Sequence, residues 1–149
     1  LRISVLGNGK RARVLPMTVI FFKRTYWNNW HIVDFSAKWD HDADKDTPAA
    51  QAKLDKKLYM KIEQLSLKAY NLCGCRDYAD IDIRLAKDNT PYFIEINCNP
   101  GIAPTDGMER LAKIAGLTYG GYLKKIVLSA LARKKVICPI LREKFSEPF

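Results

Sequence analysis

The chain has 149 residues, of which 48% are hydrophobic and 28% charged, a balance typical of a folded globular domain. No apolar run approaches the roughly 18 residues of a transmembrane helix, and no secretory signal is recognisable, so we expect a cytoplasmic protein without a membrane partner. The net charge of +9 is compatible with nucleic acid or a phosphorylated small molecule as a partner, although a solvated surface accounts for most of the charge. Because the sequence contains no nucleic-acid motif, we favour a nucleotide triphosphate over nucleic acid.

The sequence begins at Leu1, without an initiator Met and inside a segment that already reads as a strand. We therefore expect it to be a piece of a longer protein. The sequence contains four cysteines: Cys73, Cys75, Cys98 and Cys138. They lack a zinc-ribbon spacing, so we expect neither a metal site formed by these thiols nor a disulfide framework. We expect the thiols to be reduced, which favours an intracellular protein.

Three apolar, β-branched segments are predicted strands: 1–6, 13–22 and 31–35. A turn signature over residues 7–10 joins the first two into a hairpin. Pro16 lies within the second segment and indicates an edge strand or a bulge, because proline cannot donate to a strand ladder.

An Asp-rich segment over residues 40–47 lacks periodicity and is predicted to be a loop. Thr47 and Pro48 then favour a helix start, since Thr is a good N-cap and Pro suits the first helical position. Apolar residues recur at steps of three and four from there, which predicts a long helix over residues 48–72 that ends before Gly74.

Two helices are predicted near the C-terminus. Asp106 with Glu109 resembles a capping box for a short helix that Gly116 closes. Two segments follow, a turn and a last helix: 117–121 and 122–133. We expect one domain over residues 1–133 and a tail over residues 134–149.

The most informative segment is a β-hairpin over residues 78–97. Because side chains alternate along a strand, one face is apolar and the other polar. On the first arm, one face carries Ala79, Ile81, Ile83 and Leu85 and the other face carries Asp80, Asp82 and Arg84. On the second arm, one face carries Ile94 and Ile96 and the other carries Phe93, Glu95, Asn97 and Asn99. We expect the two apolar faces to pack into one core, which brings Asp82, Glu95 and Asn97 together.

Oxygen ligands of this kind suit Mg²⁺, which completes its shell with water and phosphate oxygens. The alternative for Asp82, Glu95 and Asn97 is an ordinary solvated sheet face. Lys38 is a candidate contact for a phosphate, with a solvated lysine as the alternative. Gly101 permits close backbone approach to a ligand, although a simple strand-ending turn explains it equally well.

These segments together resemble the C-terminal half of ATP-grasp ligases, closest to the D-alanine–D-alanine ligase branch. The Glu-x-Asn-x-x-Pro-Gly ending of the hairpin and an Asp thirteen positions before the Glu carry most of the resemblance. Further segments agree in order over roughly residues 1–133: 1–7, 14–16, 34–39, 47–49 and 116–119.

The resemblance implies that ATP is the nucleotide and Mg²⁺ or Mn²⁺ the metal, with Asp82, Glu95 and Asn97 as ligands. Further roles follow from it: Lys38 holds the γ-phosphate, Ile94 lies against adenine, Arg84 lies near the nucleotide, and Gly101 donates its N–H to the tetrahedral intermediate. The implied reaction joins a carboxylate to an amine through an acyl phosphate.

Two positions depart from the family pattern. The family has an Arg two residues before the metal Asp, and this chain has Asp80; it has a Ser where this chain has Asp106. Because an acid would repel a substrate carboxylate, both residues are candidates for substrate specificity, and we expect an acceptor that is neutral or cationic at that end.

The sequence thus predicts an α+β ATP-grasp C-terminal lobe, with a mostly antiparallel sheet and helices packed on one face. The predicted function is an ATP-dependent carboxylate–amine ligase, although ligase activity is not expected of this chain alone. Its expected partners are small-molecule carboxylate and amine substrates and the N-terminal part of the same protein, and a homodimer is left open. The alternatives are a catalytically inactive ATP-grasp relic that binds nucleotide or acts as a scaffold, and a basic nucleic-acid binder.

Overall fold

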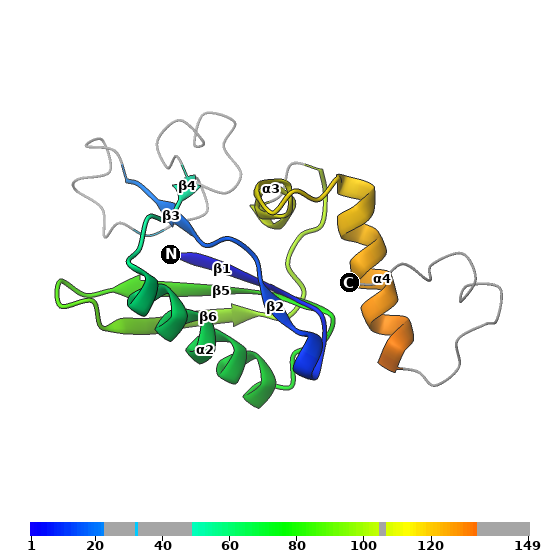
Figure 1. The fold of residues 1–149 in the computed structure, drawn as a ribbon, viewed down its shortest axis with the longest axis horizontal. Coiled ribbons are helices and arrows are strands. Elements are labelled where there is room, and N and C mark those ends of the chain that lie inside the picture. The colour runs from blue at the N-terminus through cyan, green and yellow to red at the C-terminus, as the bar shows by residue number, and fades with distance from the viewer. Residues whose placement is uncertain (23–31, 33–48, 105–106, 134–149) are drawn as a thin grey trace.

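Figure 1 shows a computed structural model of the chain, which describes residues 1–22, 32, 49–104 and 107–133. Its centre is an antiparallel sheet with six strands among the described residues: β1 (Arg2–Leu6), β2 (Arg13–Val14), β3 (Thr18–Ile20), β4 (Ala49–Gln51), β5 (Tyr78–Leu85) and β6 (Pro91–Asn97). The strand order is β4-β3-β1-β5-β6, and β2 pairs with β1 beside this path. The predicted α+β class with a mostly antiparallel sheet is confirmed.

The N-terminal segment forms the predicted hairpin, with the short 3-10 helix η1 (Gly9–Arg11) in its turn. Gly7 begins this turn at a φ of +101°, and a Cβ there would lie 2.7 Å from the carbonyl oxygen of Arg11, so a side chain does not fit. The single strand predicted over residues 13–22 is instead divided into β2 and β3 on either side of Pro16. Both parts still pair antiparallel with β1.

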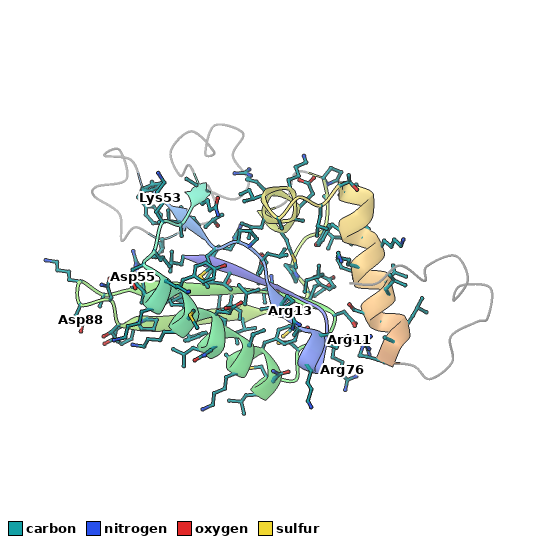
Figure 2. The ribbon with its side chains drawn as sticks, viewed as in Figure 1. Arg11, Arg13, Lys53, Asp55, Arg76 and Asp88 are labelled. Atoms are coloured by element: carbon teal, nitrogen blue, oxygen red, sulfur yellow. The ribbon has the colours of Figure 1, made fainter. Side chains whose placement is uncertain are left out.

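The long helix α2 (Lys56–Leu72) begins later than the sequence predicted. Ala49–Gln51, expected to be helical, pairs with β3 as β4, because a free strand edge outweighs the weak helix propensity of three residues. The N-cap is Asp55, whose side chain accepts a hydrogen bond of 2.9 Å from the backbone N–H of Leu58. Figure 2 labels Asp55 at the start of α2. Thr47 and Pro48 lie outside the described residues, and the predicted end before Gly74 is confirmed by its φ of +66°.

Strands β5 and β6 pair in the predicted hairpin, but a bulge interrupts the ladder. Asp82 lies opposite Glu95 and the next residue, Ile83, lies opposite Phe93, so Ile94 is the extra residue. The prediction that Ile94 shares the buried face with Ile96 is therefore wrong: Ile94 is 63% exposed and Phe93 is opposite the buried Ile83.

The helices cover the sheet from two sides, whereas the sequence predicted helices on one face only. Helix α2 packs on the face predicted to be apolar, in a cluster built from β1, β5 and α2: Ile3, Val5, Ala79, Ile81, Ile83, Leu58, Ile62 and Tyr70. Helices α3 (Gly107–Ile114) and α4 (Tyr119–Arg133) pack against the opposite side, around Leu6, Leu15, Met108, Leu111 and Tyr122. Fully burying one such aliphatic side chain contributes about 1.5–3 kcal/mol, so both clusters stabilise the sheet.

Helix α4 starts at Tyr119, which corrects the predicted turn over residues 117–121. The hydroxyl of Thr118 accepts a hydrogen bond of 3.1 Å from the N–H of Gly121 and caps the first turn, so the two glycines of this segment lie inside the helix. Figure 1 shows α4 beside the end of β1. None of the helices in the described part of the chain is long and apolar enough to cross a membrane.

Candidate active site

Three carboxylates and an amide lie on one face of the β5–β6 hairpin. Asp82 is directly opposite Glu95 in the ladder, and Asp80 is opposite Asn97. Because alternate residues share a face, all four side chains lie on the side of the sheet away from α2. The Asp82 side chain is 37% exposed, and Glu95 and Asn97 are exposed. The structure therefore brings together the three residues that the sequence singled out as metal ligands.

A neighbouring cation was missed by reasoning from the sequence. Arg2 lies opposite Asp82 in the β1–β5 ladder, and its Nε atom is 3.8 Å from the Asp82 carboxylate and 3.9 Å from that of Asp80. Ser4, opposite Asp80, donates a short hydrogen bond to it. A Cβ at Gly107 would collide with the Arg2 guanidinium, so the start of α3 lies directly beside this group. The alternation of Arg2, Ser4 and Leu6 was the only signal in the sequence.

The donor set fits a hard divalent cation. Among residues 1–22, 49–104 and 107–133, no three His, Cys, Asp or Glu side chains are grouped to enclose a metal by themselves. Asp82 and Glu95 offer carboxylates and Asn97 an amide oxygen, which is the partial shell that Mg²⁺ completes with water and phosphate oxygens. The Asn97 oxygen accepts a hydrogen bond of 3.0 Å from the N–H of Asn99, and its second lone pair remains available. Glu95 and Asn97 are exposed on this face, so their oxygen atoms are accessible from solvent.

The other candidate residues surround this face to different degrees. Arg84 lies two residues beyond Asp82 on the same side of β5 and is exposed. Ile94 presents its side chain at the bulge, and Gly101 is exposed directly after the buried Pro100. Lys38 and Asp106 lie outside the described residues.

Hydrogen bonds hold the loop that leads from β6 to Gly101. Tyr78 donates its hydroxyl to the Asn99 side chain at 2.7 Å, and Tyr119 of α4 donates to the carbonyl of Ile102 at 3.1 Å. The loop is thus tied to β5 on one side and to α4 on the other. This fixes the position of the Gly101 backbone relative to the hairpin.

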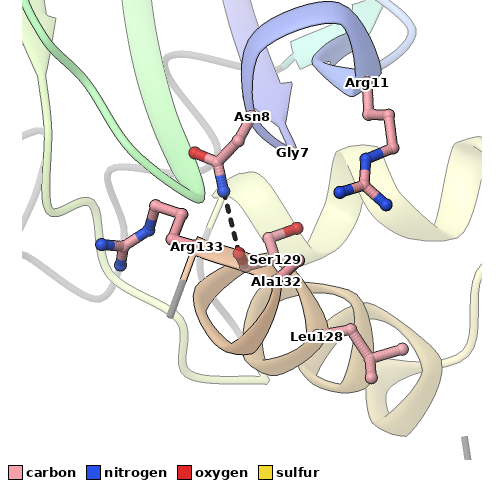
Figure 3. Close-up of a pocket in the computed structure, with 7 residues that line it drawn as sticks. All are labelled: Gly7, Asn8, Arg11, Leu128, Ser129, Ala132 and Arg133. Atoms are coloured by element: carbon pink, nitrogen blue, oxygen red, sulfur yellow. Dashed lines mark hydrogen bonds between the residues drawn. The ribbon is translucent and has the colours of Figure 1, made fainter. Parts of the chain in front are cut away.

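A small cavity lies elsewhere, between the turn after β1 and α4. It has a volume of about 60 Å³ and is lined by Gly7, Asn8, Arg11, Leu128, Ser129, Ala132 and Arg133. Figure 3 shows the side-chain N–H of Asn8 donating across it to the Ser129 carbonyl, at 3.0 Å. The same amide binds Asp77, which also pairs with Arg133. The cavity is too small for a nucleotide, and we interpret it as the packing seam between α4 and the sheet.

Comparison with known proteins assigns the family. The chain is 30% identical to the D-alanine–D-alanine ligase of Pseudothermotoga lettingae over 131 residues, which are 88% of this chain and 41% of the relative. It is 31% identical to that of Albidiferax ferrireducens over 118 residues, 78% of this chain and 32% of the relative. The chain therefore spans about two fifths or less of the length of these curated relatives.

Solved structures show the same fold. The D-alanine–D-alanine ligase of Bacillus anthracis complexed with ATP has a TM-score of 0.65 and 25% identity, over 90% of this chain and 39% of that chain. The ligase of Coxiella burnetii has a TM-score of 0.67 at 18% identity, over 89% of this chain and 31% of that chain, and supports the fold alone. The model of the family described as D-ala D-ala ligase C-terminus matches residues 1–128. The chain therefore belongs to the family of D-alanine–D-alanine ligase C-terminal domains, with the ATP-grasp fold.

Proposed function

We propose that the chain is the nucleotide- and metal-binding lobe of an ATP-dependent ligase that joins a carboxylate to an amine through an acyl phosphate. The observation that carries this is the pairing of Asp82 with Glu95 across the hairpin, with Asn97 on the same face, in a chain of this family. The Bacillus anthracis relative, a structure described as complexed with ATP, supports the choice of nucleotide. Because the chain spans about two fifths of its relatives, we expect no ligase turnover from it alone.

Each residue of the site has a role in this reaction. When bound, Mg²⁺ or Mn²⁺ neutralises phosphate charge and aligns the in-line transfer. Asp82, Glu95 and Asn97 hold the metal. Lys38 contacts the γ-phosphate, and Arg84 lies near the nucleotide.

Two further groups contact the organic parts of the reactants. The exposed Ile94 packs against adenine and removes apolar surface from water. A substrate carboxylate attacks the γ-phosphorus and displaces ADP, and the amine then attacks the acyl carbon, loses a proton and expels phosphate. The N–H of Gly101 donates to the oxyanion that forms in this second step.

Arg2 changes the interpretation of the departure at Asp80. The Asp80 carboxylate accepts a hydrogen bond from Ser4 and lies beside Arg2, so these two groups offset much of its negative charge. Arg2 thus supplies a guanidinium at the site although position 80 is acidic. We propose that Asp80 positions Arg2, and that Asp106 contributes more to the choice of acceptor.

Metal binding by the purified chain tests the site directly. Mn²⁺ titration followed by electron paramagnetic resonance, with ADP present, should show saturable binding that Asp82→Asn and Glu95→Gln each weaken at least tenfold. This follows because even groups outside the coordination shell typically change affinity by about 10–100-fold. Asp88→Asn is the matched control, since Asp88 is an exposed carboxylate in the turn of the same hairpin and Asn can keep its hydrogen bond to the Thr90 N–H. Equal binding by Asp82→Asn and wild type would refute the assignment.

The acceptor is tested by turnover of the complete ligase. ADP release across a panel of amino acids and amines should be fastest with an acceptor that is neutral or cationic at the end facing Asp106. Strong, selective turnover with two D-alanines would contradict this expectation.

A further inference from the structure

Two thiols lie in contact at the open end of the β5–β6 hairpin. Cys75 precedes β5 and Cys98 directly follows Asn97, and their Sγ atoms are 3.2 Å apart. Cys75 is buried at 9% exposure, whereas Cys98 is exposed. Cys73, the third cysteine in the described part of the chain, is also a free thiol and is exposed.

The backbone brings these two residues together. They are 23 residues apart in sequence, but the antiparallel ladder closes with Asp80 opposite Asn97, so the segments before β5 and after β6 emerge side by side. A disulfide has an S–S length of about 2.05 Å, so the sulfur atoms must approach by only about 1.2 Å.

Cys98 also lies between two residues that are hydrogen-bonded to each other, Asn97 and Asn99. The Asn97 amide oxygen accepts from the N–H of Asn99, and the Asn99 side chain accepts from Tyr78, so Cys98 is the central residue of a small hydrogen-bonded turn. A covalent link at Cys98 would hold this turn closed, which restricts the Asn97 oxygen to its second lone pair and fixes the direction from which it can reach a metal. Asn97 is the amide ligand of the metal site proposed above.

We propose that Cys75 and Cys98 form a reversible disulfide that closes the Asn97–Asn99 turn and weakens metal binding at the adjacent site. The regulatory half of this proposal rests on the proposed function, whereas the disulfide itself does not. The modification links the redox state of the surroundings to the loop that leads to Gly101.

The oxidant is a low-molecular-weight disulfide, RSSR. The exposed Cys98 thiolate attacks one sulfur of RSSR, which forms a mixed disulfide and releases RS⁻. Cys75 then loses its proton and attacks the Cys98 sulfur, which expels the second RS⁻. The two protein thiols lose two electrons and two protons, and RSSR takes them up as two RSH. Burial and the hydrogen bond with Cys98 raise the pKa of Cys75 to about 12, which supports Cys98 as the first to react.

Oxidation of the full chain with glutathione disulfide tests the link. Mass spectrometry of the wild type should show a loss of about 2 Da and a peptide that joins Cys75 to Cys98. Cys98→Ser should give no such peptide, and Cys75→Ser should stop at the glutathione adduct of Cys98. Cys73→Ser is the matched control and should still form the link. A disulfide that maps to Cys73 or Cys138, or glutathione adducts without any disulfide between protein thiols, would overturn the proposal. The peptide map of the wild type is sufficient to test the Cys75–Cys98 disulfide even if the Cys75→Ser variant, which changes a buried residue, does not fold.

Mn²⁺ titration in the presence of ADP tests the regulatory half. The oxidised chain should bind Mn²⁺ at least threefold more weakly than the reduced chain, and a thiol reductant should restore the affinity. Equal affinity in both forms overturns the regulation and leaves the disulfide standing. If the reduced chain binds no Mn²⁺ with ADP, the proposed function and the regulation both fail, while the mass map still decides the disulfide.

Discussion

Replacing Asp77 by Asn removes the negative charge that joins α4 to the start of β5. Asp77 is 8% exposed and forms a two-point ion pair with Arg133, one arm of which is a 2.9 Å hydrogen bond from Nε. It also accepts a hydrogen bond of 2.7 Å from the side chain of Asn8. The φ of Asp77 is +68°, which Asn tolerates, so this variant changes the charge without adding backbone strain.

The size of the effect follows from the contacts. A hydrogen bond to a charged group contributes about 1.5–3 kcal/mol, and the variant weakens two such bonds from Arg133. The Arg133 side chain is 33% exposed, so water recovers part of that energy. We therefore expect Asp77→Asn to lower the free energy of unfolding by about 2 kcal/mol, and the melting temperature by about 6 °C for a chain of this size.

The effect should depend on pH. Burial alone would raise the pKa of Asp77, but hydrogen bonds from Arg133 and Asn8 outweigh it and lower that pKa below its ordinary value of 3.8. A lowered pKa in the folded state stabilises the protein above pH 3.8, and this contribution is lost as the pH falls through the lowered value. The difference between wild type and variant should therefore be full at pH 7 and pH 5 and shrink below about pH 3.8.

Urea denaturation followed by circular dichroism measures this difference. The loss should be small when Arg133 is already Met, since the variant then removes no ion pair. Asp88→Asn is the matched control and should unfold at the urea concentration of the wild type. An equal loss in the wild-type and Arg133→Met backgrounds would refute the assignment of the energy to the ion pair.

Three further predictions follow from the fold and the site. Gly7→Ala should cost about 2–3 kcal/mol of stability in urea denaturation, because its Cβ meets a carbonyl, whereas Gly74→Ala has open space and should cost about 1 kcal/mol. Arg2→Gln should raise Mn²⁺ affinity several-fold at low salt and lose this gain at high salt, since it removes a cation beside two carboxylates; unchanged affinity at low salt would contradict the electrostatics. Ile94→Ser should leave stability within about 0.5 kcal/mol but weaken ADP binding about tenfold in calorimetry, and a large loss of stability would show that Ile94 is a packing residue.

Local periodicity explains which parts of the fold could be predicted. The alternation in β1, β5 and β6 and the three- and four-residue steps of α2 are strong signals, and each of these elements is present. The predicted start of α2 was wrong because Ala49–Gln51 has a preference for helix when considered alone. It forms a strand only because β3 offers an edge with which it can pair. The bulge at Ile94 was missed because one extra residue leaves the apolar pattern intact.

Residues of the site divide in the same way. The grouping of Asp82, Glu95 and Asn97 could be predicted because a single hairpin determines it. Arg2 could not, since it reaches the site only through the register of β1 with β5, which pairs residues 80 positions apart. The contact of Cys75 with Cys98 depends likewise on how the ends of the hairpin meet.

The bulge at Ile94 also has a consequence for how this hairpin can vary between homologous sequences. The side chains of a strand change faces with every residue, so a single insertion in β6 would normally turn Glu95 and Asn97 to the wrong side. The bulge accommodates one extra residue of β6 between the turn and the part of the ladder that contains Asp82. If an insertion or deletion changes the length of β6 by one residue on the turn side, the loss or displacement of the bulge can compensate for it. The turn from Ala86 to Thr90, whose central residues 87–89 are exposed, can thus vary in length while the carboxylates keep their positions. It is therefore the place on this hairpin to insert a peptide tag.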